Sequence, residues 1–541
     1  MSRVLIITSA AYPDPELEAE FGRVPPAFLP IGNRRLFVHQ RAAIGDSAQR
    51  VVLSLPDGFV PDPVDLQLLA ELGIEAVHVP DGLSLGQSIV YVINVTATAG
   101  GPVAILHGDT LLRGLDMDTL DTVSTSRIPP GYQWGRVHLR DGFLESATPD
   151  STTELPGQTV LSGYFSFSDA SLLVQAITRQ NGRFVVALTD YTARRKLRAI
   201  EAAEWLDFGH ANTYHQSRGR ITTEREFNQI NTTPRMVVKS GRNPGKITAE
   251  ARWFDALPAP MRLHAPAFLG PRDVGGKPGY ALEYLYLPTL SDLYVFGRLS
   301  PVAWTRIFDA CDEFLTACAA HPTPDGTAEA VLGLYGDKAM ERLETYARTS
   351  GVDLTEPCRL DGKWLPSLER LARLAAEAVP AVDPARHLKL VHGDFCFSNI
   401  LYDARASLVR VIDPRGLDAA GAFSVFGDLR YDLGKLYHSA VGRYDHIIAG
   451  YYRLRRSGPL DFTLDLPDDP ALAAIEAVFR GHRFAGLDLA EAGTHAICVL
   501  LFLSMLPLHS DDPRRQQALL ANALRLFLEL DATPALRERV G

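Results

Sequence analysis

The chain has 541 residues, more than the roughly 250–300 at which a single hydrophobic core stops growing, so one compact domain is excluded. Hydrophobic residues make up 46% and charged residues 22% of the composition, which excludes extensive disorder. The formal net charge of −10 provides no overall cationic field for nucleic acid or an anionic membrane. A soluble, enzyme-sized protein of several domains is expected, with small molecules as its partners.

Neither disulfide bonds nor a membrane span is expected. The five cysteines are too few and too widely spaced for a disulfide framework or a zinc site, and they suit a reducing compartment. The longest apolar stretch, Ala496–Leu508, is shorter than the roughly 18 residues that a membrane span needs. The start, Met1–Thr8, is interpreted as a first buried strand rather than a signal peptide. These patterns predict a cytoplasmic protein.

Strands and helices alternate over the first 110 residues. Short apolar runs bounded by turn residues predict buried strands, and helical spacing of apolar residues predicts helices between them. The predicted strands are Val4–Thr8, Val51–Leu55, Glu75–Val79 and Val103–Leu106, and the predicted helices are Pro63–Leu72 and Leu85–Thr98. This alternation indicates an α/β domain with a parallel sheet, whose ligands bind beyond the carboxyl ends of the strands. Asp109 follows one such end and is a candidate metal ligand.

Further along, the pattern changes from α/β to mixed and then to mainly helical. Gln158–Ser168 predicts a strand and Tyr191–Trp205 a helix, and a polar, basic stretch around His215–Arg225 marks a domain boundary. Beyond it, the predicted elements are the strand Met236–Lys239, the helix Ala249–Ala256, the strand Tyr280–Leu287, and helices from Pro301 onward, broken by strands at Lys389–Val391, Ile400–Tyr402 and Leu408–Ile412. We therefore predict a domain over residues 1–215, a small mixed lobe over 216–295, and a helical lobe over 296–541.

The strongest motif lies in the helical lobe. In Val391-His-Gly-Asp-Phe-Cys-Phe-Ser-Asn-Ile400, Asn399 follows Asp394 by five positions. Asp413 stands at the end of the predicted strand Leu408–Ile412. Phosphoryl transfer needs one carboxylate to orient the attacking hydroxyl and accept its proton. It also needs an Asn and a second carboxylate to hold the magnesium ions that bridge the ATP phosphates. The spacing therefore predicts a kinase site.

This segment resembles the aminoglycoside phosphotransferase and choline kinase superfamily, whose members carry His-Gly-Asp-x-x-x-x-Asn, an Ile-Asp pair and a downstream Asp-Leu. The third motif corresponds to Gly427–Leu433. The resemblance implies a protein-kinase-like α+β fold, with Asp394 as the catalytic residue, His392 supporting the loop, and Asn399 and Asp413 binding Mg²⁺. Arg415 departs from the usual pattern after the metal-binding Asp. It either reaches a substrate phosphate or pairs with Asp418.

The ATP-binding residues are predicted from the mixed lobe. Lys239 ends a strand-like run and Glu250 follows within a predicted helix, which suits the lysine–glutamate pair that positions the ATP phosphates in kinases. The stretch Leu282–Pro288 resembles the hinge of the superfamily, which implies that the backbone of Glu283 and Leu285 binds adenine. No Gly-x-Gly-x-x-Gly loop is present, a departure from protein kinases but not from this superfamily.

The front of the chain resembles sugar-phosphate nucleotidylyltransferases, which have a Rossmann-like, GT-A-like fold with a mixed sheet. Four segments in the family's order carry the resemblance: Pro25–Gln40, Leu85-Gly-Gln-Ser88, His107-Gly-Asp109 and Trp205-Leu-Asp-Phe-Gly209. The resemblance implies that Gln87 contributes to base recognition, that Gly108 lies at the nucleotide, and that Asp109 and Asp207 hold Mg²⁺ on a nucleoside triphosphate, CTP or UTP.

One part of the nucleotidylyltransferase pattern is missing. The family's glycine-rich turn should follow the first strand, but Ser9-Ala-Ala-Tyr-Pro-Asp-Pro-Glu16 stands there, and Pro26 replaces the usual lysine. Arg23, Arg34 and Arg35 are candidates to supply the lost phosphate contacts. Two alternatives stay open at this point: an active transferase, or a domain that keeps the fold and binds nucleotide without turning it over. Asp109 and Asp207 could also serve as turn or cap residues.

Together these patterns predict a bifunctional transferase. The kinase would phosphorylate a sugar or an amino alcohol with ATP, and the nucleotidylyltransferase would activate that phosphate as a nucleotide conjugate for surface or capsular polysaccharide synthesis. The alternatives are an active kinase with a catalytically degenerate front domain, and a nucleotide-binding regulatory pseudoenzyme. Aromatic residues near the hinge, Tyr284, Tyr286, Tyr294 and Trp304, either line a cage for a choline-like cation or belong to the core.

Overall fold

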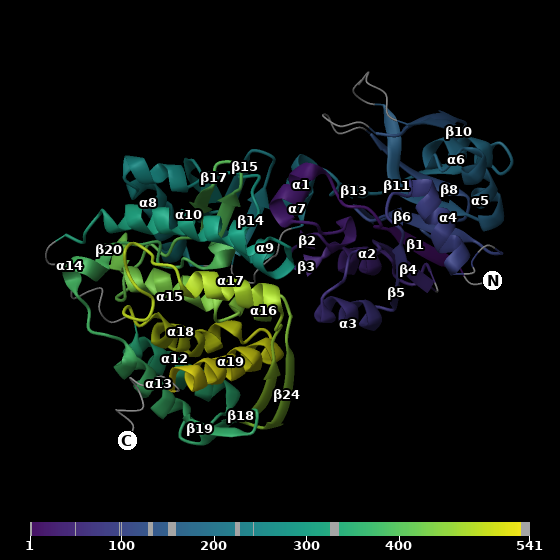
Figure 1. Ribbon diagram of the computed structural model, residues 1–541. Coiled ribbons are helices and arrows are strands. Elements are labelled where there is room, and N and C mark those ends of the chain that lie inside the picture. The colour runs from purple at the N-terminus through teal and green to yellow at the C-terminus, as the bar shows by residue number, and fades with distance from the viewer. Residues whose placement is uncertain are drawn as a thin grey trace. The chain divides into compact units, whose positions relative to one another are not determined.

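The computed structural model describes residues 3–48, 50–96, 98, 100–127, 134–149, 158–221, 228–241, 243–324 and 335–531. The chain forms two compact units, Met1–Ile221 and Thr222–Gly541, whose elements are labelled in Figure 1. No helix in the described part of the chain combines the length and the hydropathy that a membrane span requires. All five cysteines are free and buried.

The first unit is built on a nine-stranded mixed sheet of order β5-β4-β1-β6-β11-β8-β12-β10-β9. Its strands are β1 (Val4–Thr8), β4 (Arg50–Pro56), β5 (Ile74–Val79), β6 (Val103–His107), β8 (Thr122–Arg127), β9 (Arg136–Arg140), β10 (Phe143–Thr148), β11 (Thr159–Phe167) and β12 (Arg198–Glu201). Strands β5, β4, β1 and β6 run parallel, and β11 is antiparallel to β6. The predicted mixed-sheet α/β class is confirmed, and the carboxyl ends of β1 and β6 lie side by side because Thr8 pairs with His107.

Helices and short strand pairs complete the first unit. The helices are α1 (Pro15–Phe21), η1 (Pro26–Phe28), α2 (Leu36–Ile44), α3 (Pro63–Glu71), α4 (Leu85–Val95), α5 (Ala170–Arg179), α6 (Phe184–Thr192) and α7 (Ala211–Arg220). The short strands are β2 (Pro30–Ile31), which pairs with β3 (Arg34–Arg35), and β7 (Thr110–Arg113), which pairs with β13 (Glu204–Asp207).

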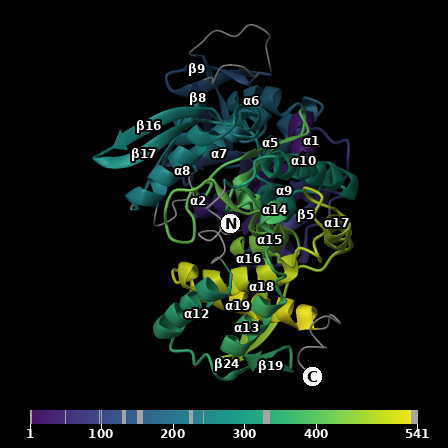
Figure 2. The same cartoon turned by 90° about the vertical axis from the view of Figure 1, so that its left-hand side faces the viewer.

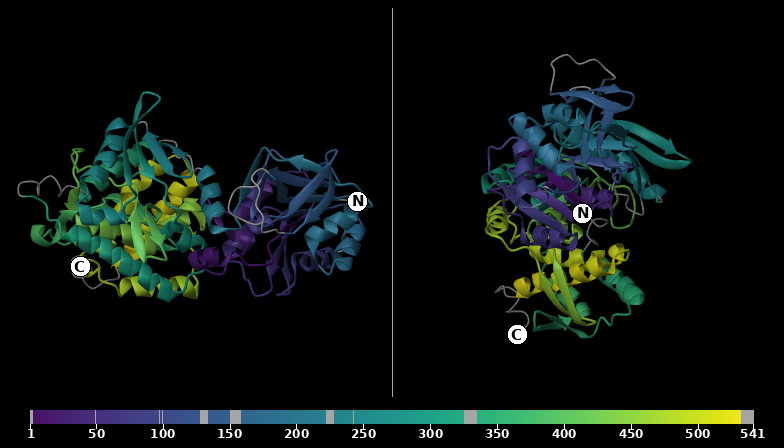
Figure 3. Two further views of the ribbon diagram at one scale, coloured as in Figure 1. Left: turned by 90° about the horizontal axis from the view of Figure 1, so that it is seen from above. Right: turned by 90° about the vertical axis from the view of Figure 1, so that its right-hand side faces the viewer.

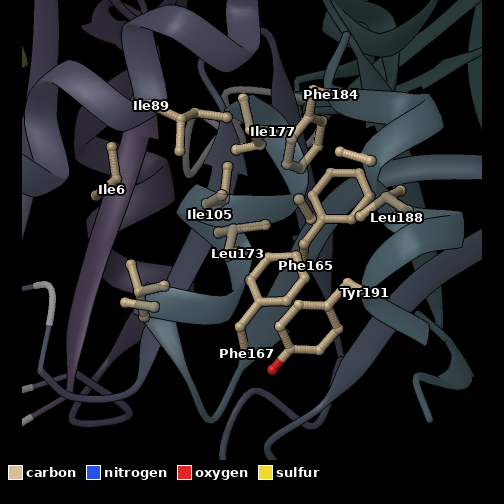
Figure 4. Close-up of a cluster of buried hydrophobic side chains, with 14 of the residues drawn as sticks. Ile6, Ile89, Ile105, Phe165, Phe167, Leu173, Ile177, Phe184, Leu188 and Tyr191 are labelled. Carbon is tan, nitrogen blue, oxygen red and sulfur yellow. The ribbon is translucent and has the colours of Figure 1, made fainter. Parts of the chain in front are cut away.

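A single apolar cluster holds the sheet to helices α4, α5 and α6 (Figure 4). Ile6 and Ile105 of the parallel strands and Phe165 of β11 are fully buried in it. Each such side chain contributes about 1.5–3 kcal/mol by leaving water. The rings of Phe165 and Phe184 meet edge to face with centroids 4.9 Å apart, which fixes α6 against β11.

The prediction of a helix over Tyr191–Trp205 was wrong. Helix α6 ends at Thr192, and the rest of that stretch forms β12 and β13. Strand β12 pairs in parallel with β8, so tertiary pairing decides the structure here rather than local helical spacing. The consequence is functional, because β13 brings Asp207 opposite Thr110 and therefore next to Asp109.

The second unit begins with a small lobe of four antiparallel strands and one helix. The sheet has the order β14-β15-β17-β16, and β16 and β17 form the long hairpin seen in Figure 2. The elements are β14 (Asn228–Thr232), β15 (Met236–Gly241), α8 (Pro244–Ala256), η2 (Ala259–His264), β16 (Phe268–Val274) and β17 (Lys277–Glu283). Asn243 caps α8 by accepting from the Lys246 N–H, and Pro244 starts it, so the helix begins five residues before the predicted start at Ala249.

The larger lobe is mainly helical. Its helices are α9 (Leu290–Phe296), α10 (Pro301–Ala319), α12 (Gly336–Ser350), α13 (Leu368–Ala378), α14 (Pro384–His387), η4 (Phe397–Asn399), α15 (Leu429–Ala440), α16 (Tyr444–Ile448), α17 (Pro470–Arg480), α18 (Thr494–Met505), η5 (Leu506–His509) and α19 (Pro513–Asp531). Helix α18 is buried on nearly every side, which accounts for its apolar sequence. It lies beside α19, and both are yellow in Figures 1 and 3.

The predicted kinase motif lies on two antiparallel strand pairs. One pair is β20 (Leu388–Leu390) with β23 (Phe426–Asp428), and the other is the hairpin of β21 (Ile400–Asp403) and β22 (Leu408–Val411). A further sheet of order β19-β18-β25-β24 was not predicted. It consists of β18 (Pro357–Leu360), β19 (Lys363–Ser367), β24 (Arg453–Gly458) and β25 (Asp461–Asp465). The outer strands are mostly exposed, and β24 carries three arginines, so neither shows the apolar alternation that marks a strand in sequence.

Candidate active sites

The predicted catalytic loop of the second unit, residues 392–399, is anchored by Asp432 of α15. Its two carboxylate oxygens accept hydrogen bonds from the backbone N–H groups of His392 and Gly393, at 2.7 and 2.8 Å. Burial raises the pKa of Asp432 to about 7 despite these donors. Gly393 has φ of 79°, and a Cβ there would lie 2.7 Å from the Cβ of Arg415, so the turn requires glycine.

Asn399 closes the loop onto Asp394. The Asn399 Nδ2 donates both to the Asp394 carbonyl oxygen and to its Oδ2, each at 3.0 Å. On the other carboxylate oxygen, Lys435 Nζ of α15 lies 2.9 Å from Asp394 Oδ1. Burial alone would raise the pKa of Asp394, but the charge and hydrogen bond of Lys435 outweigh it and hold that pKa well below its usual range. Asp394 is therefore a carboxylate near neutral pH.

His392 supports the loop from the inside. Its Nε2 donates to the Ile412 carbonyl oxygen at 3.0 Å, and its Nδ1 accepts from the Asp394 N–H at 3.3 Å. Burial lowers the pKa of His392 to about 4, so the ring is neutral. The imidazole thus joins the catalytic loop to the segment that carries Asp413.

The predicted ATP lysine lies between two carboxylates. Lys239 Nζ of β15 is 2.8 Å from Glu250 Oε2 and 2.9 Å from Asp413 Oδ1. Tyr280 of β17 donates its hydroxyl to the same Glu250 oxygen at 2.9 Å. Burial would lower the pKa of Lys239, but Asp413 and Glu250 raise it above its ordinary value. The lysine is therefore held as a cation that an ATP phosphate could contact.

Asn399 and Asp413, the predicted Mg²⁺ ligands, lie on adjoining segments. The Ile412 N–H donates to the Asn399 carbonyl oxygen at 3.0 Å, which places the residue before Asp413 against Asn399. Asp413 has φ of 59°, a left-handed conformation that is uncommon outside glycine and is found at functional sites. One carboxylate and one amide oxygen beside a phosphate site fit Mg²⁺, which prefers oxygen ligands and keeps several from water and substrate.

The predicted hinge follows directly after β17. The Glu283 N–H donates to the Ala267 carbonyl oxygen at 3.0 Å, and the Tyr284 N–H to that of Arg235 at 3.1 Å. Leu285 comes next and is half-buried, before Thr289 caps α9. Of the four aromatic residues, Tyr294 and Trp304 are only 3% and 1% exposed and belong to the core, so the four do not form a cage.

Residues beyond the predicted set surround Asp394. A cleft beside the catalytic loop is lined by Gly393, Arg415, Gly416, Asp418 and Tyr431, among others. Arg415 does not pair with Asp418 and instead donates to the Tyr431 hydroxyl at 2.6 Å. Asp418 accepts from the Ala422 N–H within its own turn. Asp432 and Lys435 are three positions apart on one helix. This i, i+3 spacing at the Asp-Leu motif was the signal in the sequence from which both could have been predicted as site residues.

In the first unit, three predicted residues come together at the ends of β6 and β13. Gly108 donates its N–H to the Thr8 carbonyl oxygen at 2.8 Å, and a Cβ at Gly108 would collide with that oxygen. The Phe208 N–H donates to the Asp109 carbonyl oxygen at 2.8 Å, and Gly209 lies against the Asp109 carboxylate. Burial and the neighbouring charge of Asp207 raise the pKa of Asp109. A pair of adjacent carboxylates supplies the oxygen ligands that a divalent cation takes.

Asp207 also contacts two side chains that follow it in the sequence. His210 Nδ1 lies 3.3 Å from Asp207 Oδ2, and the Thr213 hydroxyl donates to the same oxygen. The hydrogen bond to Asp207 raises the pKa of His210. On the other side, Gln40 Nε2 donates to the carbonyl oxygens of His107, Gly108 and Thr110, which fixes the loop around Asp109. Gln40 and His210 were not predicted as site residues.

Arg23 and Gln87 have other contacts. The Arg23 guanidinium lies 4.2 Å from the centre of the Tyr12 ring and 3.6 Å from Glu18, at an exposed position. Gln87 forms the capping box of α4 with Ser84, whose N–H donates to Gln87 Oε1 at 2.9 Å. Both side chains are exposed, and neither contact joins them to Asp109 or Asp207.

Arg35 is not available as a phosphate ligand, which corrects one expectation. It is 1% exposed and forms a bidentate ion pair with buried Asp65, with Nη2 2.7 Å from Oδ2. It also donates to the Phe28 carbonyl oxygen at 2.9 Å. Arg35 therefore stabilises the segment after β2 instead of binding a ligand, because breaking its buried ion pair with Asp65 would lower the stability of the fold.

Comparison with known proteins assigns the second unit. Residues 220–461 match the model of the Phosphotransferase enzyme family, APH. This match and the kinase-like fold make the second unit a phosphotransferase domain, as the sequence predicted. The chain is therefore an enzyme. Among curated proteins, no sequence matches the chain.

The first unit is similar to solved nucleotidylyltransferase structures. A UDP-glucose pyrophosphorylase complexed with UDP-glucose is 12% identical, covers 42% of this chain and 100% of its own, and has a TM-score of 0.34. HddC from Yersinia pseudotuberculosis is 15% identical over 41% of this chain and 100% of its own, with a TM-score of 0.31. The inositol-1-phosphate CTP transferase from T. maritima is 12% identical over 41% and 97%, with a TM-score of 0.33.

Proposed function

We propose that the chain is a bifunctional transferase that phosphorylates a sugar or an amino alcohol with ATP and then activates the new phosphate as a nucleotide conjugate. The proposal rests on the arrangement in the phosphotransferase unit, where Asp394, Asn399 and Lys435 are in contact and Lys239 bridges Glu250 and Asp413. No other arrangement in the described residues combines a catalytic carboxylate with an ATP-type lysine–glutamate pair.

In this proposal each residue has one task. Asp394 orients the acceptor hydroxyl and takes its proton, and Lys239 contacts the α- and β-phosphates while Glu250 holds it. The backbone of Glu283 and Leu285 binds adenine. Asn399 and Asp413 hold Mg²⁺, which neutralises charge on the transferred phosphoryl group. His392 keeps the loop in place as a neutral ring.

The first unit would act on the product of the second. A phosphomonoester is the nucleophile that a nucleotidylyltransferase joins to a nucleoside triphosphate, CTP or UTP in this case. Asp109 and Asp207 would hold the Mg²⁺ of that triphosphate, with Gly108 beside it and Arg23 and Gln87 near the phosphates and the base. The conjugate would serve capsular or other surface polysaccharide synthesis, from a cytoplasmic location.

A second candidate function is an active kinase whose first unit binds nucleotide without transfer. Two observations favour it: no glycine lies between Thr8 and Phe21, and Arg35 is committed to Asp65. Pyrophosphate release by the wild-type chain separates the two candidates, because only a transferase splits the triphosphate.

The kinase is tested by Asp394→Asn in the full chain. We expect phosphoryl transfer to fall by about two to four orders of magnitude, the range that general acid–base groups supply, while ATP binding persists. Coupled ADP release across sugars and amino alcohols, with product mass spectrometry, gives the measurement. Asp465→Asn at the exposed end of β25 is the matched control. Transfer at the wild-type rate in Asp394→Asn would contradict the assignment of the catalytic loop. Absence of transfer by the wild type with every acceptor would favour a regulatory pseudoenzyme.

A further inference from the structure

The cleft beside Asp394 carries an arginine that faces a phenol instead of a carboxylate. The Arg415 guanidinium lies 4.4 Å from the centre of the Tyr431 ring and donates to its hydroxyl at 2.6 Å. Arg415 follows Asp413 by two positions, and its Cβ packs against Gly393 of the catalytic loop. A permanent cation therefore lies next to the place where the acceptor hydroxyl must meet Asp394.

More positive charge gathers at the same place. Lys435 contacts Asp394. Lys338 lies in the first turn of α12, three positions after Tyr335, whose ring centroid is 6.3 Å from that of Tyr431, and the charges of Arg415 and Lys435 act on it. Burial lowers the pKa of Lys338, and Arg415, Arg342 and Lys435 lower it further. Burial would raise the pKa of Tyr431, but the charges of Arg415, Lys435 and Lys338 outweigh it and bring that pKa below its usual value. The pKa of Lys338, a base, and that of Tyr431, an acid, are therefore both lowered by nearby positive charge.

The carboxylates around the cleft do not balance these cations. Asp428 is bound to Arg430, whose Nη2 lies 2.7 Å from Asp428 Oδ2, and Asp394 is already paired with Lys435. Asp418 accepts from the Ala422 N–H within its own turn, and Asp432, whose charge also acts on Arg415, accepts from the N–H groups of His392 and Gly393. Among the residues that the structure describes, Arg415, Lys338 and Arg342 have no carboxylate within ion-pair distance. A cationic acceptor would be repelled by Arg415, whose guanidinium already covers the ring of Tyr431.

We propose that the phosphate acceptor is an anion: an alcohol or sugar that carries a carboxylate or a phosphate, which Arg415 and Lys338 bind while its hydroxyl lies against Asp394. This inference deepens the proposed kinase function and rests on it, and it replaces a choline-like amino alcohol by an acidic acceptor. An arginine fork matches the geometry of either oxyanion, and the stacked Tyr431 holds that fork in place.

The transfer step then balances without another reactant. The acceptor oxygen forms a bond to the γ-phosphorus of ATP, and the bond from that phosphorus to the bridging oxygen breaks, so that ADP leaves. The hydroxyl proton passes to the Asp394 carboxylate. The cations of the cleft hold the acidic end of the acceptor and reduce its repulsion from the ATP phosphates.

The first arm of the test compares acceptors in matched pairs with the wild-type full chain. The pairs are glucose and glucose 6-phosphate, glycerol and glycerol 3-phosphate, and galactose and galacturonate, with choline and glucosamine as cationic members. We expect kcat/KM from ADP release to be at least about tenfold higher for an anionic member than for its neutral partner. Preference for a neutral or cationic acceptor would overturn the proposal while leaving the kinase function intact.

The second arm uses inorganic phosphate as a probe and does not depend on turnover. Calorimetric titration is done at low ionic strength with a saturating non-hydrolysable ATP analogue and Mg²⁺ present. We expect Lys338→Gln and Arg415→Gln to weaken phosphate binding at least about tenfold, whereas Lys363→Gln, on exposed β19, leaves it unchanged. Equal binding by Lys338→Gln and the wild type would overturn the proposal.

The two arms separate the possible failures. If no acceptor is phosphorylated but the variants still lose phosphate binding, the anion site stands and the proposed kinase function fails. If Lys338→Gln raises KM for ATP and leaves KM for the acceptor unchanged, the cations serve the nucleotide, and the acidic acceptor is wrong.

Discussion

The ionisation of Asp394 depends on one neighbouring lysine. Asp394 is a buried group whose desolvation alone would favour the neutral acid, and Lys435, 2.9 Å away, reverses this effect. A base that must accept a proton during phosphoryl transfer needs to be ionised in the ground state. In the proposed kinase, Lys435 positions Asp394 and sets the pH range in which Asp394 can accept a proton.

Replacing Lys435 by Met should move the acidic limb of the rate profile. Without the ammonium, burial raises the pKa of Asp394, so a larger share of the enzyme is protonated and inactive at a given acidic pH. We expect the acidic limb of kcat/KM against pH to shift upward by about one unit or more. Lys435→Arg should restore most of the wild-type profile. A merely structural role would lower the rate at every pH and leave the limb where it is.

Sequence spacing predicted the short-range part of this site and missed the long-range part. Asp394 and Asn399 lie on one loop and are in contact, so their five-residue spacing sufficed to assign both to one site. Lys435, Tyr431 and Lys338 reach the site from α15 and α12, and only the fold brings these helices to the loop. Likewise Arg35 looked like a phosphate ligand in sequence, since its buried partner Asp65 lies on a separate helix.

At the scale of elements, helices α15 and α16 carry buried histidines that should make the second unit sensitive to acid. Burial lowers the pKa of His446 to about 3, and the charge of Arg443 lowers it further. Its ring centroid lies 4.9 Å from that of Tyr294 within the core. The folded unit therefore keeps His446 neutral at pH values where an unfolded chain would protonate it.

His446→Gln should reduce this acid sensitivity. The folded-state pKa lies below the unfolded value of about 6.5, so the unfolded chain binds the extra proton between these values. The stability is fully present above about pH 6.5 and is lost as pH falls. Between pH 7 and pH 5 we expect the wild type to lose about 2 kcal/mol more unfolding free energy than His446→Gln. Urea unfolding at both pH values measures it, and parallel losses would contradict the assignment.

The elements that the sequence predicted are those with strong apolar patterns. The parallel strands β1, β4 and β6 are largely apolar runs because both faces of their sheet are covered, whereas the edge strand β5 is partly exposed. All four strands were predicted. Strands β19 and β24 were missed because most of their residues are exposed, so their sequences lack the alternation of apolar and polar residues that core packing produces. Strand β12 was missed because its structure depends on pairing with β8.

At the scale of the whole molecule, each unit has its own core and its own candidate site. We expect a fragment that begins at Thr222 to fold and retain kinase activity, and residues 1–221 to fold separately, because their cores are complete within each unit. Calorimetry and ADP release from the separate fragments measure this. Aggregation of both fragments, or one indivisible melting transition in the full chain, would contradict two independent domains.

The two proposed activities should also fail independently when one site is removed. Asp109→Ala and Asp207→Ala should each abolish Mg²⁺-dependent pyrophosphate release from CTP or UTP plus the phosphorylated acceptor, while ADP release by the kinase stays intact. The effect should be large, because these two carboxylates are the proposed protein ligands of the ion, and Pro26 stands where the family has a lysine. Glu145→Ala is the control in the same unit, because Glu145 is exposed on β10 and contacts only the exposed Arg140 among the ion pairs described.

A coupled pyrophosphate assay across CTP, UTP, GTP and dTTP gives the measurement for this last prediction. If the wild-type chain releases pyrophosphate and Asp109→Ala does so equally well, the metal site is misplaced within the fold. If the wild type releases none with any of the four, then the segment after β1 does not support transfer. The first unit would then be a nucleotide-binding module, because backbone amides of a glycine-rich turn are what cradle a triphosphate.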